Sequence, residues 1–432
     1  MARLAPTVST AARCQQLDRD DASTPLTQAP LARSGRGAHR LGGCGACVRA
    51  GTALVAHPHG LLSTPTPIET TAVRPPVTAV PVPDPASVRP APSASADVLV
   101  PAADLVADCQ QILLTAGADP TVARLVTENA ICAEVRGHAA VGVSHLLDHV
   151  DAMLESLLDG AAEPVLTHPA PSVFRADARG GVPHTAFEAL LPRIVAAAHL
   201  QGLVAFAQSG AYTCGSLGWF THRLAEHGLI GIGTATSPAL MAAGPSGGPV
   251  FGTNPMAFSL PRAGGAPLTL DQASSAVAWV RVREAAARGE QIPADWALDP
   301  TGRPTTDPAA GLAGALLPFG GHKGANIALM VELLSSLAGG RWSMDAAPFD
   351  RGAVSPAVGT LLIALDPALL DEEYVQRSSD HLERLAALGV RVAPAVCTSG
   401  RSHLTLPGLL VAQLEERLGR TPASPPPPSA PL

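Results

Sequence analysis

The sequence predicts a mixed α/β fold of α+β-like character, because stretches with helical and strand-like apolar patterns alternate along the chain. Apolar residues recur at helical spacing in five segments, and we expect helices over residues 102–132, 142–158, 186–199, 217–227 and 323–337. Short apolar runs bounded by turn residues predict buried strands over residues 202–207, 229–234, 257–260, 267–270 and 359–365.

Local signals support these elements. Asp119 and Pro120 suit the N-cap and the first position of a helix, and Gly264-Gly265 suits a turn between two strands. Gly231-Ile232-Gly233 begins a dinucleotide fingerprint, but Thr236 stands where the third glycine belongs, and these glycines fall within an expected strand. A Rossmann domain is therefore not predicted.

Composition separates the ends of the 432-residue chain from its middle. Residues 1–100 are rich in alanine and proline, and residues 421–432 contain a proline run, so we expect both to be disordered. Cys44 and Cys47 have no second pair to complete a zinc site, and no metal site is predicted. The net charge of −7 argues against nucleic acid, and no stretch has the length or apolarity of a membrane span or secretory signal. We expect a cytoplasmic protein.

Three turns built from small residues carry the chemical signal. They are Val250–Pro255 (VFGTNP), Asp271–Ser275 (DQASS) and Gly320–Gly324 (GGHKG). Glycine lets the backbone approach a ligand closely, while Thr, Asn, Asp and Lys supply hydrogen bonds and charge. Turns of this kind suit a phosphate-bearing cofactor held against a small polar substrate.

In this order, the turns resemble the type-2 malate/L-lactate dehydrogenase family of NAD(P)-dependent oxidoreductases, which includes reductases of Δ1-pyrroline-2-carboxylate and Δ1-piperideine-2-carboxylate. The resemblance runs from about Asp104 to about Leu370, and further matching blocks are Glu134–His138, Leu229–Ile232, Ile292–Asp299, Pro304–Pro308 and Ala328–Leu334. It implies a distinct, non-Rossmann NAD(P)-binding fold and a homodimer. It also implies a helical N-terminal part of the catalytic region (101–210), a cofactor-binding domain (211–345) and a C-terminal part that returns to the catalytic region (346–420).

The resemblance also implies site residues. Thr253 and Asn254 are expected at the substrate, although the turn could instead only make the fold rigid. The residues expected at the cofactor are Thr213, Cys214, Gly215, Ser216, Leu217, Asp271, Gln272, Ala273, Gly321, His322 and Lys323. Asp271 suits a ribose hydroxyl or an N-cap on the following segment, and Lys323 suits a phosphate at a helix start. The basic residues expected after Arg391 are missing or displaced, so NADH and NADPH both remain possible.

One departure from the family pattern bears on the reaction. The family has a Ser-His pair, with the histidine as proton donor, where this chain has Ala140 and Val141, and His145 stands where the family has a substrate-gripping arginine. In one interpretation the substrate is a cyclic imine that can be protonated in solution and needs no strong protein acid.

In a second interpretation another group is the acid, and the candidates are His145, His138 and His322. Arg136 is a further candidate catalytic residue, which could bind the substrate carboxylate or form a structural ion pair with Glu134. The first interpretation favours reduction of a cyclic 2-imino acid. The alternatives are a malate/lactate-type 2-hydroxyacid dehydrogenase and a cofactor-binding protein that has lost catalysis.

Overall fold

A computed structural model describes residues 97–349, 354–392 and 401–420. The chain divides into two units, Met1–Val82 and Pro83–Leu432, and every described residue belongs to the second. Cys44, Cys47 and the predicted disordered tail lie outside the described residues.

The largest sheet has seven strands in the order β2-β3-β4-β13-β5-β8-β9. Their bounds are β2 (Val165–Ala170), β3 (Val173–Asp177), β4 (Leu203–Ala211), β13 (Val358–Leu365), β5 (Ile230–Ala235), β8 (Met256–Arg262) and β9 (Gly265–Gln272). Only β3 and β4 pair in parallel, and the other neighbours are antiparallel. This pattern differs from the parallel sheet of a Rossmann domain, as the incomplete glycine fingerprint predicts.

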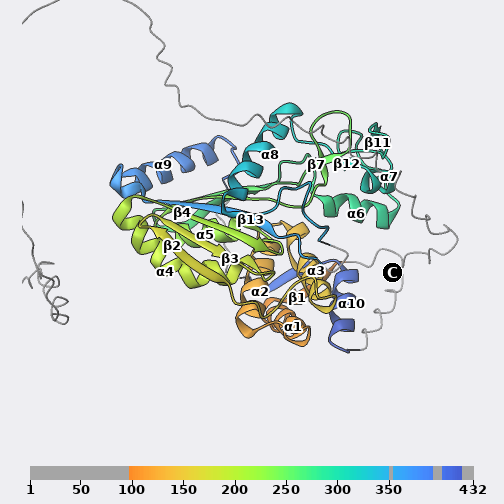
Figure 1. The fold of residues 1–432 in the computed structure, drawn as a ribbon, viewed down its shortest axis with the longest axis horizontal. Helices are drawn as coiled ribbons and strands as arrows, with labels where there is room; N and C mark the ends of the chain where they lie inside the picture. Colours follow the sequence, from red (N-terminus) through yellow and green to blue (C-terminus); the bar gives the residue numbers. More distant parts are fainter. Residues whose placement is uncertain (1–96, 350–353, 393–400, 421–432) are drawn as a thin grey trace, which may run out of the picture. The chain divides into compact units, whose positions relative to one another are not determined.

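Helices lie on both faces of this sheet (Figure 1). On one face, α4 (Pro183–Gln201) and α5 (Leu217–Glu226) bury an aromatic-rich core against the strands, with Phe206, Trp219 and Leu362 among its members. On the other face lie α8 (His322–Ser335) and α9 (Tyr374–Ala387). Because both faces are covered, the central strands are apolar on both sides, which explains their continuous apolar sequences.

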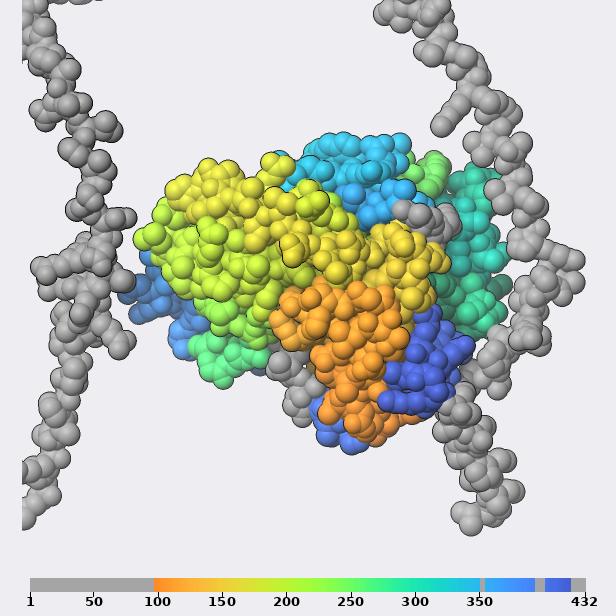
Figure 2. Space-filling view, turned by 60° about the horizontal axis from the view of Figure 1, so that its bottom comes forward, coloured from red at the N-terminus to blue at the C-terminus, as the bar shows by residue number. Residues whose placement is uncertain are grey.

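The N-terminal helices form a second layer with the end of the chain. These elements are β1 (Val98–Pro101), α1 (Ala102–Thr115), α2 (Pro120–Val135), η2 (Ala139–Val141), α3 (Val143–Leu154), β14 (His403–Leu406) and α10 (Gly408–Arg417). Strand β1 pairs antiparallel with β14, and Figure 2 shows the orange N-terminal helices beside the dark-blue C-terminal segment. Residues far apart in the sequence are therefore packed into one helical layer.

A five-stranded sheet of short strands lies in the order β11-β10-β12-β6-β7. Its bounds are β11 (Pro304–Thr305), β10 (Ala297–Leu298), β12 (Ala315–Leu316), β6 (Met241–Ala242) and β7 (Pro249–Phe251). The remaining elements are α6 (Trp279–Arg288), α7 (Pro308–Ala313), η3 (Ser336–Ala338) and η4 (Pro367–Leu369).

The mixed fold class is confirmed, and each predicted helix and strand has a counterpart in the structure. The long helix expected over residues 102–132 is two helices, because the turn before Asp119 interrupts it, and Asp119 Oδ1 caps the second by accepting a hydrogen bond from the Thr121 N–H at 2.7 Å. The boundary placed at residue 100 falls inside β1. Strands from all three segments of the enzyme region enter the seven-stranded sheet, and their division into functional parts stays a prediction.

Candidate active site

The three small-residue turns lie together, and Ser274 joins them. Its backbone N–H donates to the carbonyl of Thr253 at 2.7 Å, and its hydroxyl donates to the carbonyl of Asn254 at 2.8 Å. Its own carbonyl accepts from the Phe319 N–H at 3.0 Å, just before the third turn. Ser274 is 1 % exposed, so these bonds are shielded from water and hold the turns in one arrangement.

The two residues expected at the substrate differ in their surroundings. Thr253 is half-buried, and its hydroxyl lies 3.4 Å from that of Ser237. Asn254 is fully buried, and its amide nitrogen donates to the Ala328 carbonyl at 3.0 Å and to the Glu332 carboxylate at 2.7 Å. Asn254 also has a positive φ of 37°, a conformation that Asn tolerates better than most residues. We therefore assign Asn254 to holding the turn, and Thr253 retains a side chain that can reach a ligand.

Asn129 on α2 organises the expected cofactor loop, Thr213–Leu217. Its amide donates to the carbonyls of Cys214 at 3.3 Å and Ser216 at 3.0 Å, while its oxygen accepts from the Ser216 N–H at 2.9 Å. Gly215 has φ +60°, and a Cβ there would lie 2.6 Å from the Asn129 oxygen. Burial raises the pKa of the Cys214 thiol to about 12, which makes it a packing residue and not a nucleophile.

Asp271 lies at the start of helix α5. Its Oδ2 accepts from the Ser216 hydroxyl at 3.0 Å and from the Gly218 N–H at 2.8 Å, so it caps a helix that precedes it in the sequence. The expected N-cap on the segment after Asp271 is therefore wrong, because the carboxylate caps the preceding helix α5. An expected ribose contact would use the other carboxylate oxygen.

Arg136 and His138 lie in the same electrostatic environment as Asp271. Burial lowers the pKa of Arg136, and the negative charge of Asp271 opposes that effect. One terminal nitrogen of Arg136, Nη2, is buried without a hydrogen-bond partner, and Glu134 instead accepts from the Val143 N–H at 2.8 Å. Burial likewise lowers the pKa of His138; Asp271 raises it, and the charges of Arg136 and Arg391 lower it further. Arg136 thus has an unused donor that suits a carboxylate.

The third turn presents its residues to solvent. Gly321 is the N-cap of α8, with φ +63°, and His322 and Lys323 occupy the first turn of that helix. All three are exposed, as is Gln272, while Ala273 is half-buried beside Ser274. Free N–H groups and a cation at a helix start form a suitable surface for a phosphate.

His145 connects α3 to the cofactor loop. Its Nδ1 lies 3.0 Å from Asp148 Oδ2, and its Nε2 lies 3.1 Å from the Thr213 hydroxyl. His149, one turn along the helix, donates from Nδ1 to the His145 carbonyl at 2.8 Å. His145 therefore has a fixed orientation between a carboxylate and a hydroxyl.

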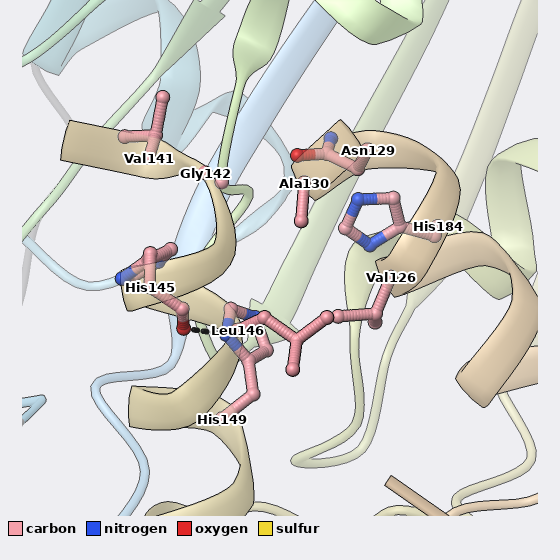
Figure 3. Close-up of a pocket in the computed structure, with 10 residues that line it drawn as sticks. Val126, Asn129, Ala130, Val141, Gly142, His145, Leu146, His149 and His184 are labelled. Carbon is pink, nitrogen blue, oxygen red and sulfur yellow. Dashed lines mark hydrogen bonds between the residues drawn. The ribbon is translucent and has the colours of Figure 1, made fainter. Parts of the chain in front are cut away.

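A small pocket adjoins His145 and has room for about one water molecule (Figure 3). His149 reaches it from α3 and His184 from the first turn of α4, while Val141 and Asn129 form other parts of its wall. Burial lowers the pKa values of His149 and His184 to about 3, with the charge of a nearby histidine acting in the same direction. Both rings are therefore neutral at neutral pH.

Asn129, Ser274 and His184 were not among the expected site residues. Asn129 is a polar residue within a largely apolar helical stretch, which is the one sequence signal that marks it. Ser274 lies inside the DQASS turn, where the sequence does not distinguish it from the adjacent small residues Ala273 and Ser275. His184 lies far from the other site residues in the sequence. Their roles follow from long-range contacts.

Two further properties concern the described part of the chain. Within residues 97–349, 354–392 and 401–420, no group of three or more His, Cys, Asp or Glu side chains is arranged to hold a metal ion. No helix in these same ranges has the length and apolarity needed to cross a membrane.

Comparison with known proteins identifies the family that the chain resembles. A family model described as malate/L-lactate dehydrogenase matches residues 100–405. The Δ1-pyrroline-2-carboxylate/Δ1-piperideine-2-carboxylate reductase of Pseudomonas putida is 36 % identical over 311 residues, which cover 70 % of this chain and 90 % of the relative. A (2R)-3-sulfolactate dehydrogenase (NADP(+)) of Chromohalobacter salexigens is 43 % identical over 220 residues, 50 % of this chain and 64 % of the relative.

A solved structure is similar over nearly its full length. The crystal structure of Δ1-piperideine-2-carboxylate reductase from Pseudomonas syringae pv. tomato matches with a TM-score of 0.68 and 31 % identity, covering 74 % of this chain and 99 % of that one.

Proposed function

Because the chain belongs to the malate/L-lactate dehydrogenase family, we propose that it is an NAD(P)H-dependent reductase of small cyclic 2-imino acids. The substrates would be of the Δ1-pyrroline-2-carboxylate and Δ1-piperideine-2-carboxylate type, the substrates in the names of the Pseudomonas relatives. NADH and NADPH are both candidate cofactors, and the bound cofactor would supply the hydride.

The observation that carries this proposal is the chemistry around residues 140 and 141. Ala140 and Val141 have no proton to give, while His145, which lines a pocket together with Val141, is hydrogen-bonded to the Thr213 hydroxyl. A hydroxyl is a weak acid. It suits an imine, whose nitrogen can already carry a proton, better than a ketone, whose oxygen must gain one during the reaction.

The site has groups that fit both ligands. The unpaired Arg136 Nη2 suits the substrate carboxylate, and the half-buried Thr253 hydroxyl can assist it. Lys323 and the start of α8 suit a phosphate of the cofactor, and the Thr213–Leu217 loop, with Gln272 and Ala273, would lie along the rest of it.

The first test follows NADH and NADPH absorbance with Δ1-pyrroline-2-carboxylate, Δ1-piperideine-2-carboxylate, pyruvate and oxaloacetate. We expect kcat/KM for the cyclic imines to exceed that for the ketoacids by at least ~100-fold, because a ketone depends on a strong general acid more than an imine does. Preferred turnover of the ketoacids would favour the 2-hydroxyacid dehydrogenase alternative. Cofactor binding without any turnover would favour the non-catalytic one.

Arg136 gives a second test. An Arg136→Gln variant should raise KM for the imine by ~10–100-fold, the value of one or two charged hydrogen bonds, with a smaller effect on kcat. Arg124→Gln is the matched control, because Arg124 lies on the same helix and pairs with Glu128 at the surface. An unchanged KM in Arg136→Gln would remove Arg136 from the substrate site.

We also propose that the protein is a homodimer that uses one face of α8 and of the short helix η3 that follows it. Leu329, Met330, Leu333, Leu334 and Leu337 are 38–68 % exposed and recur at helical spacing, so they form an apolar stripe. An exposed stripe of this kind is typical of an interface.

Sedimentation should find a dimer for the wild type and a monomer for Leu333→Glu. Leu200→Glu, at an exposed position of α4 on the opposite face of the sheet, should remain a dimer. A monomeric wild type would contradict this proposal. A cytoplasmic location stays a prediction.

A further inference from the structure

Asp148, His145 and Thr213 form a chain of a carboxylate, an imidazole and a hydroxyl. Asp148 lies three residues after His145 on α3, which places both on one helix face, and Thr213 comes from the loop after β4. The two contacts of 3.0 and 3.1 Å use both ring nitrogens of His145. This is the order in which a carboxylate orients a histidine that exchanges a proton with a hydroxyl.

His145 differs from the two other histidines of the pocket. Its side chain is 12 % exposed, whereas His149 and His184 are 2 % and 1 % exposed. His145 can therefore exchange a proton with solvent, whereas His149 and His184 are enclosed neutral rings.

Asp148 carries its negative charge directly beside His145. Burial raises the pKa of Asp148, but the His145 hydrogen bond and the charges of His145, Arg283 and His149 together hold it below its ordinary value. Arg283 Nη1 lies 3.7 Å from Asp148 Oδ1, the carboxylate oxygen that does not contact His145. The ring of Phe349 packs edge-on against the His145 ring, with 6.4 Å between the ring centroids. Asp148 is thus an anion directly beside the imidazole.

We propose that the Thr213 hydroxyl is the catalytic proton donor of this site, that His145 reprotonates it, and that Asp148 positions His145. This assignment rests on the proposed reductase function and names its proton source. It gives Thr213 a role beyond the cofactor contact that the family resemblance implies.

The proton moves from His145 through the Thr213 hydroxyl to the substrate. The O–H bond of Thr213 breaks as an N–H bond forms on the imine nitrogen, while the Nε2–H bond of His145 breaks and the O–H bond of Thr213 forms again. The substrate carbon is reduced by the hydride and the cofactor is oxidised. His145 is left neutral, hydrogen-bonded to Asp148, and regains a proton from solvent.

The kinetic test compares Thr213→Val with wild type across pH. At pH 6, where more of the imine arrives protonated, kcat should fall by less than about threefold, whereas at pH 9 it should fall by ~100-fold, the size of general acid catalysis. With pyruvate the loss should be ~100-fold at both pH values. Thr213→Ser should restore activity, and Thr127→Val, which removes a buried hydroxyl on α2, is the matched control.

Two measurements separate this role from a structural one. NADPH affinity, followed by fluorescence, should change by no more than about twofold in Thr213→Val, because the hydroxyl bonds to His145. In the cofactor-free protein, NMR should show a slowly exchanging Nδ1–H of His145 that is lost in Asp148→Asn. An equal kcat loss at pH 6 and 9 together with weaker NADPH binding would overturn the proton role and leave Thr213 as a cofactor contact.

The outcome for the wild type distinguishes the two proposals. If wild type reduces only ketoacids, the imine substrate is wrong, and a ~100-fold loss with pyruvate in Thr213→Val would still support the proton chain. If wild type reduces none of the four compounds, both proposals are overturned.

Discussion

Acid should destabilise this fold through two buried histidines, His149 and His184. Burial holds the pKa of each at about 3, against an ordinary value of 6.5. Because the pKa in the folded state is the lower one, the unfolded chain binds more protons between these two values. The stability is fully present above pH ~6.5 and is lost as the pH falls toward ~3.

The size of the effect follows from these pKa values. At pH 7.5 neither state is much protonated at these sites, whereas at pH 5.5 the unfolded histidines are mostly protonated and the folded ones are not. Between pH 7.5 and 5.5, the unfolded state therefore gains over the folded state the free energy of about one pH unit of titration below the unfolded pKa. Each histidine should lower the free energy of unfolding by about 1.4 kcal/mol over this range, and the pair by about 3 kcal/mol.

His184→Phe isolates one of the two contributions. The centroid of the His184 ring lies 5.3 Å from that of Trp219 and 4.9 Å from that of Phe220. This aromatic environment can accommodate a phenylalanine ring. Neither ring nitrogen of His184 has a hydrogen-bond partner, so the variant should be at least as stable as wild type at pH 7.5. Between pH 7.5 and 5.5 it should lose about 1.4 kcal/mol less than wild type.

Urea titrations at a fixed protein concentration, followed by circular dichroism at a series of pH values, measure this difference. His381→Phe is the control, because His381 is exposed on α9 and should show the same pH dependence as wild type. If the stability of His184→Phe falls with pH in parallel with wild type, His184 is not a neutral buried ring in the folded protein and the reasoning fails.

Three smaller perturbations test the loop and the turns. Gly215→Ala should lower the free energy of unfolding by about 1–3 kcal/mol, because the added Cβ would lie 2.6 Å from the Asn129 side-chain oxygen and the backbone φ is +60°. The same change should weaken NADPH binding. Normal NADPH titration curves would contradict a role for this loop at the cofactor. Ser274→Ala should cost about 1–2 kcal/mol in urea unfolding through the lost bond to the Asn254 carbonyl, and an unchanged midpoint would mean that the turns are held by other contacts. Cys214 should resist iodoacetamide at pH 8 in the native protein, as measured by peptide mass spectrometry, whereas rapid labelling would contradict its raised thiol pKa.

The sequence by itself determined most elements of secondary structure. Apolar spacing marks which residues face a core, and local signals such as Asp119-Pro120 mark where a helix begins, because both depend on neighbours within one or two turns. The order of the three turns also identified the family, since each turn is a continuous stretch of sequence.

Only the tertiary structure decided which of these elements meet. Strand β13 inserts between β4 and β5, although it follows them by more than a hundred residues along the chain. His145 and Thr213 are 68 positions apart in the sequence and are hydrogen-bonded in the structure. Asn129 and Ser216 are 87 positions apart and are also hydrogen-bonded. Such pairings depend on how helices and strands pack against one another, and the spacing of residues within a single element carries no record of the partner that element will meet.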